Sequence, residues 1–597
     1  MPQAKPIAIF ADASIQPTRI DLRILATTDI HMRLDDRAGT GGLSRIAPLV
    51  GQQRQAFRNT LLFDNGDLLE GTPLGDEIAR NGLPPDDAHP AITALNMMRY
   101  DAITLGNHDF AHGLPFLRRA LRDVECPVVV SNAHPTAGKA SWSHCALIRR
   151  SVTDENGAPH AISIGVFGVL PPQTTDWMPA LAKQVTTEDV AVAAKRAIID
   201  LRAQGADIII ALSHGGEGGD DGAHPENASD LIASLPGVDA VIAGHTHELL
   251  IRPATDTRAA IVMPGFGGSH LAALRLELSG QPGSWRVRCK SVELIPAGKE
   301  TCPRLTAIAK SCYRRFAERL ESPIAHSTNP LNTHFAQLGR CPGLWIIDEA
   351  VCAHVGSALP GNTLPIISVN APFATGGRNG PDNYVLIEPG PIRLADLSLL
   401  YPFRNVVAAI PVTGAEISLW LELAARHFNQ ITPGAQTEHL INDTVPGYLF
   451  DIIPRLDYEI DLSRPPADPA ATPPDMGKGR IRNLSCRSAP IRADDRFLLV
   501  TNSYRMAASQ HYARLTAGKT CQLPDHARLP VRDIILRHLS QHSEINPCYT
   551  PHFRFRAPVG SAAIFDTSPK ADSTESPIQA ESLGLTDRGF QRLHLRS

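Results

Sequence analysis

Short apolar runs alternate with mixed polar and apolar segments through the first half of the chain. Runs of this kind, each followed by a polar cluster, are LRILATTD, TLLFDNGD, YDAITLGN, ISIGVFGV, DIIIALSH and VDAVIAGH. Buried strands that alternate with helical segments are typical of layered α/β domains. The loops at the ends of such strands are where these folds place binding and catalytic groups. The pattern therefore predicts an α/β domain over residues 21–300, with its chemistry at the strand ends.

A different pattern follows this region. Residues 301–325 are amphipathic and predict a helix that links two domains. Residues 326–556 mix strand-like runs such as IISVNAPF and RFLLVTNSYR with the helical pattern GAEISLWLELAARHFNQ, which predicts a mixed α/β domain. Residues 1–20 are expected to be an N-terminal tail. Residues 557–597 are rich in Ser, Ala, Pro and charge, and predict a second, loose tail.

Composition excludes several classes of protein. With 43% hydrophobic and 20% charged residues in 597, the chain has the composition of a folded globular protein. Its 57 Lys and Arg against 61 Asp and Glu give a net charge of −4, which argues against binding of a nucleic-acid polymer. No run approaches the roughly 18 apolar residues of a membrane span. The oligomeric state is not visible in the sequence.

Cysteine usage and the N-terminus bear on the compartment. The ten cysteines include no CxxC pair, so we expect mostly reduced or buried thiols. The only apolar run near the start is Ile7–Ala11, shorter than the 7–15-residue core of a secretory signal. A cytoplasmic location is therefore expected if the chain begins at its true start.

Histidine clusters with carboxylates directly after the strand-like runs. The clusters are Asp29-Ile30-His31, Gly66-Asp67, Gly106-Asn107-His108-Asp109, Ser213-His214 and Gly244-His245-Thr246-His247. Each cluster alone is more often a turn or a core histidine. Together they offer O and N ligands without thiolate, a set that suits Mn, Zn, Fe or Co. They are too many for one tetrahedral ion, so they predict two divalent metal ions, with Asp67 as the natural bridging carboxylate.

Such a site suits phosphoester hydrolysis, because two metal ions activate water and clamp the phosphoryl group. His108 is not needed as a ligand, so it is free to donate a hydrogen bond or a proton to the leaving oxygen or to the phosphoryl group. Asp109 either fixes the tautomer of His108 or only caps a turn. Arg378, in a Gly-rich loop, is either a contact for an anion or a solvated surface residue.

The order DIH, GDLLEG, GNHD, SH and GHTH resembles the motifs of the calcineurin-like metallophosphoesterases. The second region resembles the C-terminal domain of the 5′-nucleotidase family through APFATGGRNGPDNY, YPFRNVVAAIPVTGAEI and TNSYR. Within that family, HFNQITPG, LIND and LFDIIPRLDYEIDLSRP look most like bacterial 2′,3′-cyclic-nucleotide 2′-phosphodiesterase/3′-nucleotidases. The resemblance extends from about residue 21 to about residue 556.

The resemblance implies a four-layer α/β/β/α metallophosphoesterase domain followed by a mixed α/β domain that binds a small-molecule nucleotide. It implies one metal held by Asp29, His31, Asp67 and His247, and another held by Asp67, Asn107, His214 and His245. It makes His108 catalytic, with Asp109 as its orienting partner. The implied substrate contacts are Arg378, Tyr401, Phe403 and Tyr504, with core packing as the alternative for the aromatic residues.

The activity implied is hydrolysis of 2′,3′-cyclic nucleotides to 3′-nucleotides, and of 3′-nucleotides to nucleoside and phosphate. A 5′-nucleotidase or UDP-sugar hydrolase is the first alternative, because MAASQHYARL follows Arg505 where the family usually has a glycine-rich, Asp-containing stretch. The second alternative is a catalytically silent nucleotide-binding protein. The presence of every expected type of metal ligand argues against it. The family expectation for location is the periplasm.

Overall fold

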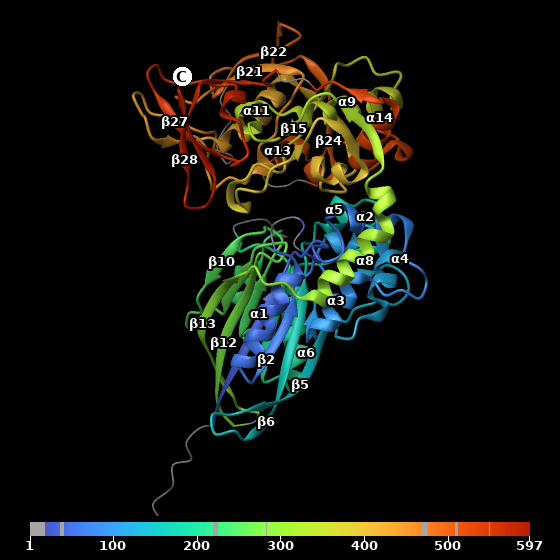
Figure 1. Ribbon diagram of the computed structural model, residues 1–597, viewed down its shortest axis with the longest axis vertical. Helices are drawn as coiled ribbons and strands as arrows, with labels where there is room; N and C mark the ends of the chain where they lie inside the picture. The colour runs from blue at the N-terminus through green and yellow to red at the C-terminus, as the bar shows by residue number, and fades with distance from the viewer. Residues whose placement is uncertain are drawn as a thin grey trace, which may run out of the picture.

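The chain forms two lobes, the first coloured blue to green and the second yellow to red (Figure 1). The computed structural model describes residues 18–35, 37, 41–218, 225–281, 283–468, 475–507, 512–547 and 550–596. Helix α8 (Pro303–Leu320) lies within the range 301–325 and runs along the first lobe to the second. No helix in the described ranges is long and apolar enough to cross a lipid bilayer.

Two sheets form the first lobe, in the orders β13-β12-β1-β2-β3 and β10-β11-β9-β8-β6-β5. The first sheet consists of β1 (Thr18–Thr27), β2 (Thr60–Asp64), β3 (Ala102–Ile103), β12 (His270–Gly280) and β13 (Arg286–Pro296). The second consists of β5 (Cys145–Thr153), β6 (Pro159–Val169), β8 (Ile208–Ser213), β9 (Ala240–Ala243), β10 (Leu249–Arg252) and β11 (Ala260–Pro264).

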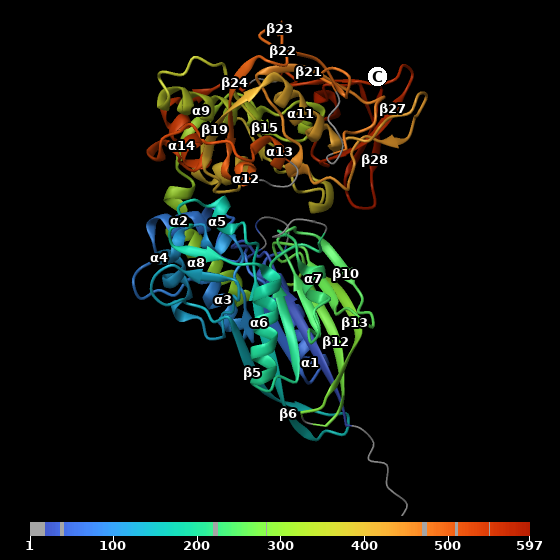
Figure 2. The same cartoon turned by 180° about the vertical axis from the view of Figure 1, so that it is seen from behind.

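The two sheets pack face to face between helical layers, which confirms the predicted α/β/β/α order. Side chains such as Ile24 and Phe63 from one sheet and Ile164 and Ile210 from the other fill the space between the sheets. Helices α1 (Leu43–Ala56), α3 (Pro90–Met98) and α8 cover the outer face of the first sheet. Helices α6 (Val190–Ala203) and α7 (Ser229–Ala233) cover the second (Figure 2). Shorter elements complete the lobe, namely α2 (Pro73–Asn81), α4 (Gly113–Ala120), α5 (Thr174–Trp177), β4 (Ala133–Pro135) and β7 (Val185–Thr187).

The second lobe packs its helices and small sheets around one apolar core. Its longer helices are α9 (Pro342–Ala358), α11 (Gly414–Ala424) and α14 (Val531–Gln541). Helix α11 begins with a capping box, in which Thr413 Oγ1 accepts from Glu416 N at 3.2 Å and the Glu416 carboxylate accepts from Thr413 N at 2.8 Å. Its strands include β16 (Ile366–Ser368), β24 (Arg496–Asn502) and β19 (Val407–Thr413), paired in that order.

The remaining strands of the second lobe form short sheets. They are β14 (Pro323–Ser327), β15 (Leu331–Asn332), β17 (Leu386–Ile387), β18 (Gly390–Arg393), β21 (Leu456–Asp461), β22 (Ile481–Cys486), β23 (Ala489–Pro490), β25 (Glu544–Ile545) and β26 (Arg554–Arg556). Short helices lie where the lobe faces its neighbour or beneath that surface, namely α10 (Leu397–Leu400), α12 (Ser503–Met506) and α13 (Ala513–Thr516). The stretch that distinguishes this chain after Arg505 is partly outside the described residues, at 508–511.

The prediction of a loose tail over residues 557–597 was wrong. This segment contains β27 (Ala562–Thr567), β28 (Ala580–Leu585) and β29 (Gln591–Arg596), which join β20 (Glu438–His439) in one sheet. Phe565 and Leu593 are fully buried in the core of the lobe. The Ser-, Pro- and charge-rich residues between β27 and β28 dominated the composition and concealed these short strands. At the other end, β1 begins at Thr18, inside the predicted tail 1–20, while residues 1–17 lie outside the described part.

Replacing Phe565 with alanine is expected to destabilise the second lobe by about 3–5 kcal/mol, because a buried aromatic side chain is lost and a cavity remains. Leu585→Ala is the control, since Leu585 lies in the same sheet with 69% of its surface exposed. Urea titration of both variants measures the free energy of unfolding. If Phe565→Ala costs no more than Leu585→Ala, the closing segment is not part of the core.

Candidate functional site

The predicted ligands lie where parallel strands of the two sheets end. Strands β1, β2 and β3 are parallel neighbours in one sheet, and β8 and β9 are parallel neighbours in the other. The carboxyl ends of parallel neighbours meet at one edge of a sheet. This edge of both sheets faces the second lobe (Figure 1). The residues that follow these strands there are Asp29, His31, Asp67, Asn107, His214, His245 and His247.

The backbone at this edge is unusual. Most of the predicted ligands have left-handed φ angles, which non-glycine residues rarely adopt and which cluster at functional sites. Hydrogen bonds between the loops hold this conformation, from Asp29 N to Gly66 O at 2.9 Å and from His31 N to Asp67 O at 2.8 Å. The positive angles are Asp29 50°, His31 50°, Asp67 56°, His245 71° and His247 59°.

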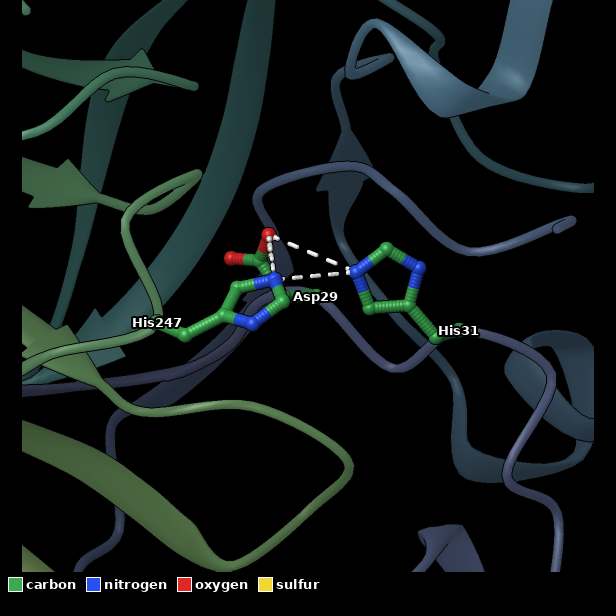
Figure 3. Close-up of side chains that lie close together, drawn as sticks. All are labelled: Asp29, His31 and His247. Carbon is green, nitrogen blue, oxygen red and sulfur yellow. Dashed lines mark hydrogen bonds and ion pairs between the residues drawn. The ribbon is translucent and has the colours of Figure 1, made fainter. Parts of the chain in front are cut away.

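One group of possible metal ligands consists of Asp29, His31 and His247 (Figure 3). The two histidine Nε2 atoms lie 3.1 Å apart, and Asp29 Oδ1 lies 3.8 Å from the first and 3.4 Å from the second. His31 donates through Nδ1 to the backbone oxygen of Glu70 at 2.9 Å, which leaves the lone pair of Nε2 facing the group. Burial lowers the pKa of His31 to about 4, so the ring is neutral, as a metal ligand must be.

A second group consists of Asp67, His214 and His245. His214 donates through Nδ1 to Asn65 O at 2.7 Å, so Nε2 faces Asp67 Oδ2 at 3.0 Å. His245 Nε2 lies 2.8 Å from Glu226 Oε1, which leaves Nδ1 available.

Two further observations fit a pair of cations. Asp67 Oδ2 also lies 4.0 Å from His31 Nε2, so this carboxylate reaches both groups. The buried oxygen Oδ1 of Asn107 has no hydrogen-bond partner among the described residues, which is costly unless a cation or water binds it. Asp67, a member of the second group, thus also reaches the first, and Asn107 offers a further oxygen atom.

Electrostatics at this edge also fit cations. Burial alone would raise the pKa of Asp67, but His214 and His108 hold it well below its usual value. Burial alone would lower the pKa of His214, but Asp67 and Asp29 raise it to about 10. The buried carboxylates therefore favour a positive charge between them, which a bound cation would supply.

The carboxylate that contacts His108 is not the one predicted. Its Nδ1 is hydrogen-bonded to the carboxylate of Glu70. Burial alone would lower the pKa of His108, but Asp67 and Glu70 raise it to about 9. This shift favours the protonated imidazole, the form that a proton donor requires.

Asp109 does not contact the ring of His108, so its predicted orienting role was wrong. Adjacent side chains in a helical turn point in different directions, and His108 and Asp109 are neighbours in the short helix η1 (His108–Phe110). Asp109 instead accepts backbone N–H bonds from the loop after β2 and from the start of its own turn. The donors are Asp67 at 2.9 Å, Leu68 at 2.9 Å, Leu69 at 2.8 Å and Gly106 at 2.9 Å. Asp109 thus fixes the loop that carries Asp67.

A cavity of about 220 Å³ lies between the lobes, above the predicted ligands. Tyr504 and Phe403 line it, as predicted for substrate contacts. The centroid of the Tyr504 ring lies 5.7 Å from that of the Trp177 ring in the first lobe and 6.5 Å from that of the Tyr448 ring. The Phe403 ring lies 5.8 Å from that of His108. Aromatic faces from both lobes therefore border the space next to His108.

The other two predicted substrate contacts, Tyr401 and Arg378, are not seen to line the cavity. Tyr401 is fully buried, its hydroxyl accepts from Asn502 Nδ2 at 3.0 Å, and its ring packs 5.1 Å from Phe373, so its predicted stacking role was wrong. Its burial follows from its place at the end of α10, where its side chain joins the core. Arg378 falls in the short helix η4 (Gly377–Asn379), and its side chain lies outside the described residues.

The sequence interpretation did not identify several residues of the site. Glu70 stands inside the GDLLEG motif, so its position there was a usable signal. Tyr448, Trp177 and Glu226 lie outside the ligand motifs and reach the cavity only through the fold.

Comparison with protein-family models places both halves of the chain. Residues 22–249 match the model of the calcineurin-like phosphoesterases, and residues 350–516 match that of the 5′-nucleotidase C-terminal domain. The putative 5′-nucleotidase of Staphylococcus aureus, solved with α-ketoglutarate, has the same fold, with a TM-score of 0.68 at 19% identity over 90% of this chain and 99% of that one.

Curated relatives match over nearly the whole chain. The 2′,3′-cyclic-nucleotide 2′-phosphodiesterase/3′-nucleotidase of Salmonella typhimurium is 31% identical, covering 98% of this chain and 97% of that protein. The trifunctional nucleotide phosphoesterase YfkN of Bacillus subtilis is 32% identical over 94% of this chain, which spans 40% of that longer protein. With both domain models matched in order, the chain belongs to the family of proteins that join a calcineurin-like phosphoesterase domain to a 5′-nucleotidase C-terminal domain.

Proposed function

We propose that this protein hydrolyses 2′,3′-cyclic nucleotides to 3′-nucleotides, and 3′-nucleotides to nucleoside and phosphate, with two divalent metal ions. The observation that carries the proposal is the pair of ligand groups, both within reach of the Asp67 carboxylate, beneath a cavity bordered by aromatic side chains. The relatives that match nearly the whole chain are named for these reactions.

The proposed ligands of one ion are Asp29, His31, Asp67 and His247, and those of the other are Asp67, Asn107, His214 and His245. Mn, Zn, Co and Fe all suit these oxygen and nitrogen donors. Such ions supply an activated water and neutralise charge on the phosphoryl oxygens. The protein contributes the fixed direction of each donor, through bonds such as those from His31 to Glu70 O and from His214 to Asn65 O.

His108 is the proposed proton donor. Because Nδ1 is bound to Glu70, Nε2 is the nitrogen left to face the substrate. For a 2′,3′-cyclic nucleotide the leaving group is the 2′-oxygen, and for a 3′-nucleotide it is the 3′-oxygen. A protonated imidazole beside either oxygen supplies the proton that an alkoxide needs in order to leave.

The nucleoside is proposed to bind in the cavity between the lobes. Phe403 and Tyr504 offer aromatic faces, and stacking on such faces tolerates different bases. Arg378 belongs to a loop that borders the cavity through Gly377 and Asn379, and we propose that it contacts the substrate. Trp177 adds an aromatic side chain from the first lobe, which supports binding of the base between the two domains.

A substrate profile tests the proposal. Protein loaded with Mn²⁺ is incubated with 2′,3′-cAMP, 3′-AMP, 5′-AMP and UDP-glucose, and products are separated by chromatography. We expect 2′,3′-cAMP to give 3′-AMP and then adenosine, with higher kcat/KM than 5′-AMP. Hydrolysis of 5′-AMP or UDP-glucose without that of 2′,3′-cAMP would favour the 5′-nucleotidase alternative. Binding without any turnover would favour a silent nucleotide-binding protein.

A further inference from the structure

The carboxylate of Glu70 is held from two sides, one in each lobe. It lies in the loop between β2 and α2, and only 1% of its side chain is exposed. One oxygen bonds His108 Nδ1 in the first lobe. The other accepts from Arg532 Nη2 of the second lobe at 3.2 Å. The partner that orients His108 is therefore itself tied to the other domain.

Arg532 is fixed by groups from both lobes. It lies in the first turn of α14, and 5% of its side chain is exposed. Its Nη1 bonds Asp76 of α2 in the first lobe and Ser398 Oγ of α10 at 2.8 Å in the second. Its Nη2 bonds Pro402 O at 3.1 Å in addition to Glu70. A buried guanidinium needs such partners to offset its lost hydration, and its planar fork meets several of them at once.

These contacts form a continuous path from α14 to the reacting centre. If the lobes separated, Glu70 would lose its contact with Arg532. A buried carboxylate without its charged partner is strongly destabilised, so Glu70 would no longer be held in this position. The His108 side chain is 19% exposed, so it has room to turn once Glu70 no longer holds it. The orientation of His108 thus depends on a contact that exists only while the lobes meet as they do here.

We propose that Arg532 is a positioning residue that acts across the domain boundary: it holds Glu70, which holds His108 in its working orientation. This inference rests on the proposed function, because it assumes that His108 acts in catalysis. It makes catalysis conditional on the buried contact between Arg532 of the second lobe and Glu70 of the first.

The test measures kcat and KM for 2′,3′-cAMP in Arg532→Gln and Glu70→Gln, each also combined with His108→Ala. We expect each single variant to lower kcat about 10- to 100-fold, as loss of an orienting partner does, while KM changes less than about twofold. In the His108→Ala background, either substitution should change kcat less than about twofold, because its effect passes through His108.

The matched control is Asp533→Asn. Asp533 is the next residue of α14, and it forms an exposed ion pair across the same boundary with Arg80 at 2.9 Å, without contacting Glu70. Its kcat should stay within about twofold of wild type, since exposed pairs contribute little. Arg532→Lys is a second variant in case Arg532→Gln does not fold, because it keeps a buried cation. Its ammonium group cannot bridge Glu70 and Asp76 as the planar guanidinium does, so kcat should still fall.

An unchanged kcat in folded Arg532→Gln or Arg532→Lys would overturn the inference. An equal fall of kcat in the His108→Ala background would overturn it as well, because it would show a purely structural effect. A wild-type protein that turned over 5′-AMP and not 2′,3′-cAMP would overturn the proposed substrate instead. In that case the same comparison of kcat between the variants and wild type, measured with 5′-AMP as substrate, would decide the inference.

Discussion

Replacing Asp67 with asparagine should lower the turnover of 2′,3′-cAMP about a thousandfold or more. Asp67 is buried and is the carboxylate that reaches both ligand groups, with Oδ2 at 3.0 Å from His214 Nε2 and 4.0 Å from His31 Nε2. An amide keeps the size of the side chain and removes the negative charge. Losing several kcal/mol of transition-state stabilisation in a two-metal site corresponds to the thousandfold fall in rate.

Metal analysis of the dialysed variant separates this effect from unfolding. We expect fewer than two ions per chain in Asp67→Asn and a thermal unfolding curve that is still cooperative. Asp21→Asn is the control, because Asp21 lies in β1 with an exposed carboxylate paired to Arg275. Full metal content together with full activity in Asp67→Asn would refute the bridging role.

Replacing His108 with alanine should lower kcat for 2′,3′-cAMP about 10²- to 10⁴-fold, the usual contribution of a positioned proton donor. The metal content should remain that of wild type, since His108 belongs to neither ligand group. The loss should be smaller with bis(p-nitrophenyl) phosphate, whose leaving group departs without a proton. His134→Ala, at an exposed histidine of the same lobe paired with Glu188, is the control and should be silent. An equal loss with both substrates would contradict proton donation to the leaving oxygen.

The sequence contained most of the information about the ligands and the first domain. Apolar runs followed by DIH, GD, GNHD, SH and GHTH are local signals, and the carboxyl ends of parallel strands bring such residues to one edge. The left-handed backbone at Asp29 and Asp67 was not readable, because it arises from hydrogen bonds between loops that are distant in sequence.

The two wrong predictions about site residues share one cause: they depended on where a side chain points. Asp109 was assigned to His108 because the two are neighbours in sequence, but the structure turns Asp109 toward the loop of Asp67 and gives His108 to Glu70. Tyr401 and Phe403 are two residues apart in one motif, yet only Phe403 lines the cavity. Such differences follow from tertiary packing and not from the spacing of residue types.

Long-range contacts were equally hidden. Trp177 meets Tyr504, and Arg532 meets Glu70, across the boundary between two domains. The closing segment looked loose because Ser, Pro and charged residues separate its strands, while Phe565 and Leu593 are buried in the core of the second lobe. Composition describes the loops of such a segment better than its core.

The most direct test of the central claim is a metal titration of stripped protein, in which 2′,3′-cAMP turnover and bound Mn²⁺ are measured on the same samples. We predict no turnover in the stripped protein and full turnover, with 3′-AMP as the first product, when two ions are bound per chain. Turnover that is unaffected by stripping, or that is complete with one ion per chain, would contradict a site in which Asp67 serves two metals.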